Sequence, residues 1–205
     1  MPYWTYDSET QTRYTGQRGD DYEVEESYTD SEGKQQTRIV THTRWSNAWG
    51  MVHNKFDDIF VVGSKTLPRN YMDDLEPWNL EEIVPYDEKF LSGFKAETYG
   101  VDLKSGFEIA QDKMQDTIDE TIREDIGGDH QKIDTKDIDY YNITFKHLLL
   151  PIWISAYKYK DKVYRFIVNG QSGKVQGERP ISALKVIGLI VGIAAVIGLI
   201  CWLCS

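Results

Sequence analysis

The chain has 205 residues, of which 33 are acidic and 23 basic, and its formal net charge at pH 7 is −10. Because such a surface repels phosphate groups, the charge argues against nucleic-acid binding by this chain and against electrostatic adhesion to anionic lipids. The roughly 180 residues that precede the apolar C-terminal segment are enough for one domain with a sizeable core.

The N-terminal third of the chain predicts short strands joined by turns. Residues 35–46 alternate and are rich in β-branched types, and a short apolar run ends at Gly63. Both patterns favour strands. We expect Gly16, Gly19 and Gly33 to mark turns, since each lies among acidic, serine or threonine residues.

Residues 104–126 predict one long amphipathic helix, preceded by short helical turns in the acidic segment 68–86. Apolar residues recur there every three or four positions, which is the period of a helix face. The apolar stripe consists of Phe107, Ala110, Met114, Ile118, Ile122 and Ile126. We expect Ser105 to cap the first turn and Gly127 to end the helix, and we interpret the acidic opposite face as solvated.

The chain returns to strand patterns after the helix. Residues 141–146 alternate, and PIWISAYKYK and VYRFIVN, on either side of the Asp161-Lys162 pair, predict a hairpin. PYW at residues 2–4 resembles PIW at residues 151–153, so we expect two related hairpins to pair into one sheet. The predicted class is α+β: a mostly antiparallel sheet with one long amphipathic helix and short helices, plus a C-terminal transmembrane helix.

The run VIGLIVGIAAVIGLICWLC, residues 186–204, has no charged residue. At helical rise it is roughly 28 Å long, close to the thickness of a bilayer core, and so predicts a transmembrane helix. Lys185 and Trp202 are its expected membrane-interface residues. Because basic residues precede the run and none follow, we expect a cytoplasmic α+β domain over residues 1–180 and a basic juxtamembrane linker over residues 181–185.

Small residues within this run predict association between two such helices. Gly188 and Gly192 form a GxxxG pair, and Ala194 and Gly198 repeat the spacing, which allows close backbone approach. A homodimer through this segment is therefore one expected partnership, beside the lipid bilayer itself. The two cysteines of the chain, Cys201 and Cys204, also lie there, and we interpret them as small apolar residues.

Known catalytic and ligand motifs are missing from the sequence. The four histidines have no metal-ligand spacing, and the GQSGK segment, residues 170–174, is too short for a phosphate loop and is better interpreted as a turn. Two pairs of adjacent acids, Asp57-Asp58 and Asp73-Asp74, could in principle perform acid–base chemistry. We therefore predict no catalytic residue, no metal and no cofactor.

Four segments resemble the C-terminal two-thirds of an uncharacterised bacterial family of TFIIB-type zinc-ribbon-containing membrane proteins. They are PYWTYDSETQTRYTGQRG, FDDIFVVGSKTLP, PYDEKFLSGFKAETYGVDL and LLLPIWISAYKYKDKVYRFIVNGQSGKVQGERP, which together cover about residues 2–180. The resemblance implies N-terminal CxxC zinc ribbons, but no position here matches those ligands. Zinc binding is therefore not implied, and the chain resembles a member without its ribbon.

The sequence thus favours a non-enzymatic interaction or scaffold module, tethered at the cytoplasmic membrane face and holding an unknown cytoplasmic protein. One alternative is an enzyme of unrecognised type, such as an acid-dependent hydrolase using clustered carboxylates. Another is a truncated relative of zinc-ribbon proteins that bind nucleic acid or protein through the missing ribbon. No nucleic acid is expected on this chain itself.

Overall fold

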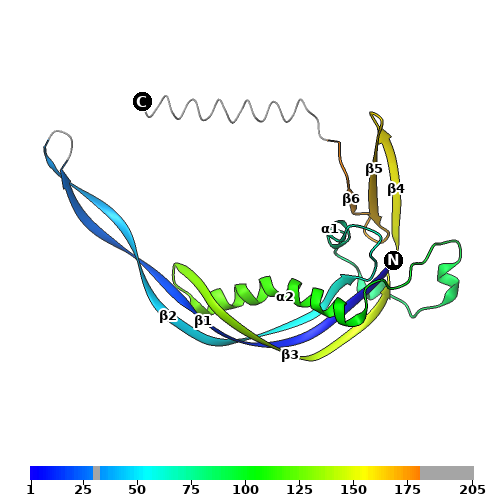
Figure 1. The fold of residues 1–205 in the computed structure, drawn as a ribbon, viewed down its shortest axis with the longest axis horizontal. Coiled ribbons are helices and arrows are strands. Elements are labelled where there is room, and N and C mark those ends of the chain that lie inside the picture. Colours follow the sequence, from blue (N-terminus) through cyan, green and yellow to red (C-terminus); the bar gives the residue numbers. More distant parts are fainter. Residues whose placement is uncertain (30–32, 181–205) are drawn as a thin grey trace. The chain divides into compact units, whose positions relative to one another are not determined.

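The computed structural model describes residues 1–29 and 33–180, which form two compact units (Figure 1). The first unit comprises Met1–Thr66 and Gly93–Leu149. The second comprises Leu67–Ser92 and the described residues from Leu150 onward. Each unit has its own three-stranded sheet. The prediction that the two terminal hairpins pair into one sheet is therefore wrong.

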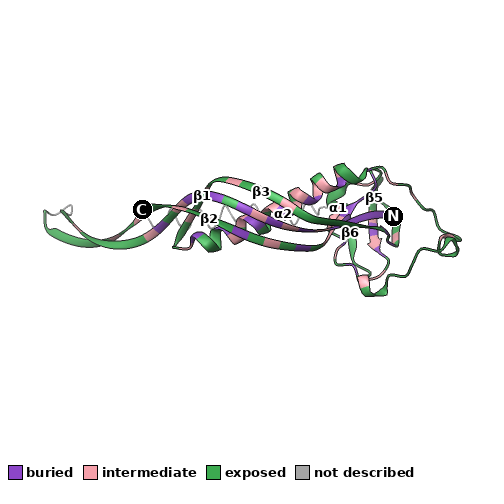
Figure 2. Cartoon of the chain, turned by 90° about the horizontal axis from the view of Figure 1, so that it is seen from below, coloured by how far each residue is buried: buried purple, intermediate pink, exposed green. Residues whose placement is uncertain are grey.

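The first unit is built on a long antiparallel sheet with the order β2-β1-β3. Its strands are β1 (Pro2–Thr29), β2 (Gln35–Val62) and β3 (His130–Leu149). From Tyr6 to Gly16 every second residue of the central strand β1 is buried, and the residues between them are half-buried or exposed. This alternation has the period of a strand that is covered on one face only (Figure 2).

Helix α2 (Leu103–Ile126) covers that face, and its apolar stripe forms the core with β1 and β2 (Figure 1). The predicted stripe is confirmed except at Phe107, which is only partly buried, while Gly106 is buried. The cap is Asp102 instead of Ser105: its carboxylate accepts the N–H groups of Lys104 at 3.1 Å and Ser105 at 3.0 Å. Such a cap satisfies amides that have no partner within the helix.

Two tyrosines of β1 hold α2 near its two ends. The hydroxyl of Tyr6 donates to the carbonyl of Leu103 at 2.8 Å, and that of Tyr14 donates to Asp125 Oδ2 at 2.5 Å. Burial, with nearby carboxylates, raises the pKa of both tyrosines to about 12. Both phenols therefore remain neutral donors at physiological pH.

Gly33 lies between β1 and β2 with φ 81°, which fits the predicted turn, but Gly16 and Gly19 do not mark turns. Gly16 and Gly19 lie inside the continuous strand β1, which runs for 28 residues without a break. A β-carbon on Gly16 would lie 2.2 Å from the carbonyl oxygen of Lys132 on β3. Gly16 is therefore used for close approach between two strands, and its sequence context could not distinguish this from a turn.

The second unit has a sheet with the order β4-β5-β6. Its elements are β4 (Ile152–Tyr159), β5 (Lys162–Asn169), β6 (Val175–Gly177), α1 (Arg69–Asp73) and the 3-10 turns η1 (Leu80–Glu82) and η2 (Glu88–Leu91). The fully buried amide of Asn169 donates to the carbonyl of Leu75 at 2.9 Å and accepts the N–H groups of Gln171 and Ser172. This side chain organises the turn predicted for residues 170–174.

The predicted fold class needs one correction. The described chain is mostly antiparallel sheet with one main helix, but it contains no helix with the length and apolar character needed to cross a membrane. The predicted C-terminal transmembrane helix, and the single-pass membrane protein that it implied, are therefore not supported. The span predicted for it, residues 186–204, lies outside the described residues, as does the linker 181–185.

Replacement of Gly106 by alanine tests the contact between α2 and β1. A β-carbon there would lie 2.3 Å from the Tyr6 hydroxyl. Although Gly→Ala within a helix ordinarily stabilises by about 1 kcal/mol, we expect Gly106→Ala to destabilise by about 1–3 kcal/mol through overpacking. Urea unfolding followed by tryptophan fluorescence measures the change.

The double variant Tyr6→Phe/Gly106→Ala should recover part of that loss, because the clashing oxygen is gone. Exposed Glu108→Ala on the same helix is the control and should change stability little. Strict additivity of the two single changes would contradict the proposed clash.

Candidate functional site

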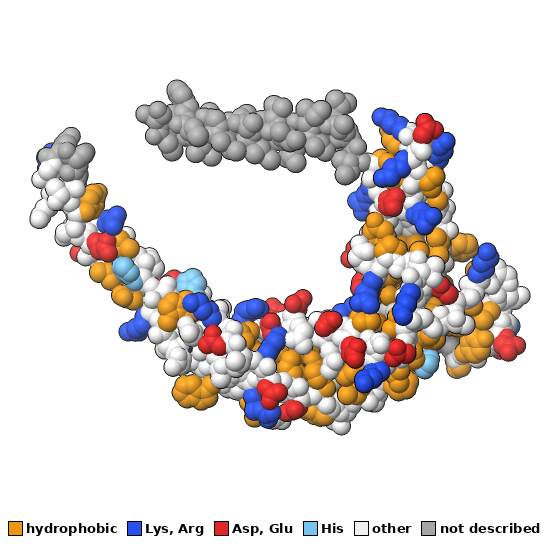
Figure 3. All heavy atoms as spheres, viewed as in Figure 1, with side chains coloured by type: hydrophobic (Ala, Val, Ile, Leu, Met, Phe, Trp, Pro, Cys, Tyr) orange, Lys and Arg blue, Asp and Glu red, His pale blue; other side chains and the backbone are white. Residues whose placement is uncertain are grey.

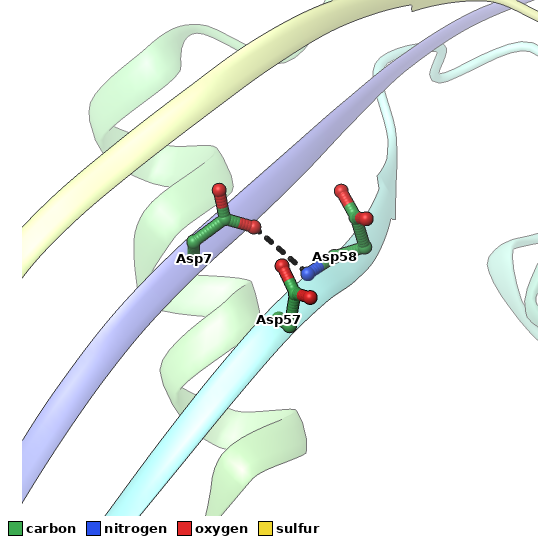
Figure 4. Close-up of side chains that lie close together, drawn as sticks. All are labelled: Asp7, Asp57 and Asp58. Carbon is green, nitrogen blue, oxygen red and sulfur yellow. Dashed lines mark hydrogen bonds between the residues drawn. The ribbon is translucent and has the colours of Figure 1, made fainter. Parts of the chain in front are cut away.

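Three carboxylates meet where β1 and β2 change register. Oxygens of Asp7, Asp57 and Asp58 lie within 4.8 Å of one another (Figure 4). The pairing passes from Tyr6↔Ile59 to Ser8↔Phe56, so Asp7 faces two residues of β2. This is a β-bulge, and Asp58 adopts φ 52°, a left-handed conformation that aspartate tolerates better than most residues.

Asp7 is the centre of a hydrogen-bond network at this bulge. Its carboxylate accepts the N–H of Asp58 and the hydroxyl of Thr144, each at 2.8 Å. The ammonium of Lys146 lies 2.5 Å from Asp58 and 3.5 Å from Asp7. Partial burial acts to raise the pKa of Asp7, but the hydrogen bonds and Lys146 together lower it below its ordinary value. Hydrogen bonding to Asp58 raises the pKa of Lys146.

These contacts identify the acidic cluster as a structural network. Carboxylate oxygens suit a hard cation such as Ca²⁺ or Mg²⁺. Both oxygens of Asp7, however, already accept hydrogen bonds, and Lys146 supplies the positive charge. The structure thus brings the predicted pair Asp57-Asp58 together with Asp7, a residue that sequence spacing did not indicate. Asp73 and Asp74, the other predicted pair, belong to the second unit.

The histidines lie in separate parts of the fold. His42 lies 3.4 Å from Glu26, and His130 lies 3.1 Å from Asp21. The ring of His147 packs 4.2 Å from that of Trp4, measured between centroids. Among the residues that the structure describes, no histidine joins a group of ligands suited to a metal ion.

A second feature of the first unit is a two-stranded arm, made of residues 20–29 of β1 and 35–44 of β2. The third strand stops pairing at Gly19↔His130, so the arm continues beyond both β3 and α2 (Figure 1). None of these twenty residues is buried. Apolar, acidic and histidine side chains are visible along it (Figure 3).

The two faces of the arm differ in chemistry because successive strand residues point to opposite sides. One face, here the apolar face, carries Tyr22, Val24, Tyr28 and Val40. Its charges compensate each other: Arg38 pairs with Glu26 at 3.0 Å and lies 5.7 Å from the centre of the Tyr28 ring. The other, here the acidic face, carries Asp21, Glu23 and Glu25 opposite Thr43, Thr41 and Ile39.

The site residues predicted for the C-terminal segment cannot be placed in this fold. They are Lys185, Gly188, Gly192, Ala194, Gly198 and Trp202, and all of them lie outside the described residues. The same holds for Cys201 and Cys204. Sequence reasoning also missed the arm, because the glycines of β1 were interpreted as breaks in the strand.

Comparison with known proteins finds one distant relative of unknown activity. The uncharacterised protein YdjG of Bacillus subtilis (strain 168) is 32% identical over 198 residues, covering 95% of this chain and 54% of YdjG. The chain therefore spans about half the length of this curated relative. No protein-family model matches the chain. No solved structure matches it.

These comparisons do not support the zinc-ribbon family relationship predicted from the sequence, since no family model matches and YdjG is itself uncharacterised.

The bulge network predicts a defined pH dependence of stability. The lowered pKa of Asp7 stabilises the fold above its unfolded value of about 3.9, and this contribution is lost as pH falls through the lower folded value. The raised pKa of Lys146 stabilises below about 10.4 and its contribution is lost as pH rises through the folded value. We therefore expect Lys146→Met to destabilise at neutral pH and to approach the wild type below about pH 4.

The effect of Lys146→Met should be about 1 kcal/mol or less, because the Lys146 side chain is 48% exposed and screened by solvent. Urea unfolding at several pH values measures it. Lys55→Met removes an exposed charge from β2, on the far side of β1 from Lys146, and is the control, for which no such profile is expected. A pH-independent loss in Lys146→Met would contradict the network.

Proposed function

We propose that this protein is a non-enzymatic protein-interaction module and that the arm is its binding element. The observation that supports this most directly is a ribbon of two strands with an exposed apolar face and no buried residue. The partner is a protein with an apolar surface that accepts this face.

The stability of the arm gives the first argument. A two-stranded ribbon that packs against nothing is marginally stable in water, since it buries little apolar area. The ladder of the arm nevertheless continues through ten pairs, from Asp20↔Arg44 to Thr29↔Gln35. A partner surface would supply a second layer over the apolar face and would stabilise the arm on binding.

The composition of the apolar face gives the second argument. Tyr22 and Tyr28 are 48% and 45% exposed, and Val24 is 37% exposed. Tyrosine is enriched at protein interfaces, because it contributes a large apolar area together with one polar group. The internal pairing of Glu26 with Arg38 leaves the face without uncompensated charge, which lowers the cost of desolvating it.

Two substitutions on the apolar face test the proposal. Tyr22→Thr/Val24→Thr keeps β-branched residues in the strand but removes the apolar contacts. Tagged full-length protein is crosslinked in cells, extracted in mild detergent and analysed by quantitative mass spectrometry. We expect the variant to lose its crosslinked partner by about tenfold or more, as for the loss of an interface hot spot.

The matched control is Tyr86→Thr/Val84→Thr, which makes the same two changes at exposed positions of the second unit. It should retain the partner. Equal capture by both variants, or no specific partner with the wild type, would refute the arm as the binding element. Circular dichroism verifies that both variants remain folded.

A further inference from the structure

The second unit contains an exposed hairpin with a positive net charge, opposite in sign to the acidic face of the arm. The hairpin of β4 and β5, residues 152–169, carries four basic residues, Lys158, Lys160, Lys162 and Arg165, against one acidic residue, Asp161, so its net charge is +3. All five are exposed. In a chain whose net charge is −10, this is a pronounced local excess of positive charge.

Most of these cations have no carboxylate partner among the residues that the structure describes. Lys158 pairs with Asp161 at 2.9 Å. Lys160 and Lys162 instead lie over the rings of Tyr159 and Tyr164, at 5.5 Å and 5.2 Å from the ring centres. These contacts leave the cationic end of the hairpin able to attract a separate anionic surface.

The acidic face of the arm is such a surface. Asp21, Glu23 and Glu25 follow one another at every second residue, and the residues paired with them are Thr43, Thr41 and Ile39, none of which is basic. Within the described chain neither Glu23 nor Glu25 forms an ion pair. The face therefore has a net charge of −3, spread along roughly 13 Å of strand.

We propose that the acidic face of the arm docks onto the β4–β5 hairpin of a second copy of this chain. The acidic face carries −3 and the hairpin as a whole carries +3, with Lys162 on one of its faces and Lys158 and Arg165 on the other, so the two ribbons are complementary in charge. This goes beyond the proposed function, because it uses the face of the arm opposite Tyr22 and Val24 and names a different partner.

Each copy offers one acidic face and one basic hairpin. Two copies can therefore exchange the contact reciprocally, or further copies can add head to tail. Association should increase with protein concentration. The oligomers should dissociate with salt, since the screening length falls from about 8 Å at 0.15 M to about 3 Å at 1 M ionic strength.

Crosslinking between isotopically distinct copies tests the contact. Equal amounts of ¹⁴N- and ¹⁵N-labelled full-length protein are mixed in mild detergent and treated with a carbodiimide, which joins carboxylates to amines that touch. We expect mixed-isotope peptides that link Glu23 or Glu25 to Lys160 or Lys162. Links found only within one copy, or none between these segments, would overturn the proposal.

Charge reversal gives the sharper test. Glu23→Lys/Glu25→Lys and Lys162→Glu/Arg165→Glu should each reduce oligomers about tenfold or more in light scattering, because like charges then face each other. Mixed together, the two variants should regain oligomers, since each reversed surface meets its complement. Reversal without effect, or a mixture that fails to recover, would refute the contact.

The neutral variant Lys162→Gln/Arg165→Gln should give an intermediate loss, and circular dichroism verifies folding. Tyr22→Thr/Val24→Thr, which leaves the acidic face intact, should form oligomers as the wild type does. Loss of these oligomers in that variant would contradict the proposal. This variant therefore distinguishes a failure of the proposed function, which uses the apolar face, from a failure of the contact between copies, which uses the acidic face.

Discussion

The packing of α2 on β1 is the contact on which the first unit depends. The helix is much shorter than the strand, and this difference explains why the arm is left uncovered. A helix of 24 residues is roughly 36 Å long, whereas a strand of 28 residues extends roughly 90 Å. One helix can therefore cover less than half of the strand that it packs against. Tyr6 and Tyr14 mark the covered part, and no helix of the described residues buries the part of β1 beyond Gly19.

The sequence predicts this helix well and the sheet poorly, for physical reasons. The stripe from Ala110 to Ile126 has a period that only a helix satisfies, so both its existence and its end at Gly127 could be predicted. The role of a glycine cannot be predicted in the same way, because glycine occurs both in turns and where two strands approach each other closely. Gly16 shows the second use, and only the position of Lys132 on β3 reveals it. The contact of Asp7 with Asp57 likewise depends on strand register, which no local pattern contains.

Net charge proves to be a coarse guide to the surfaces of this chain. The total of −10 correctly describes an acidic protein, but it averages a face with three acids and no basic residue and a hairpin with four cations. Alternation along a strand separates side chains that are adjacent in sequence, so Glu25 and Glu26 belong to opposite faces of the arm. The side chains that a partner contacts on one face are therefore determined by the alternation along the strand, and the composition alone does not reveal them.

The bulge at Asp7 has an effect far from its own position. Side chains alternate between the two faces of a sheet, so a shift of the strand register by one residue moves every later side chain to the other face. The two-against-one pairing of Asp7 with Asp57 and Asp58 permits only one alignment of β1 with β2. The bulge therefore decides which residues of β2 stand beside the tyrosines of β1 in the arm and which stand beside its acids. Without the extra residue, Arg38 and Val40 would move to the acidic face, and Ile39 and Thr41 would move to the apolar face.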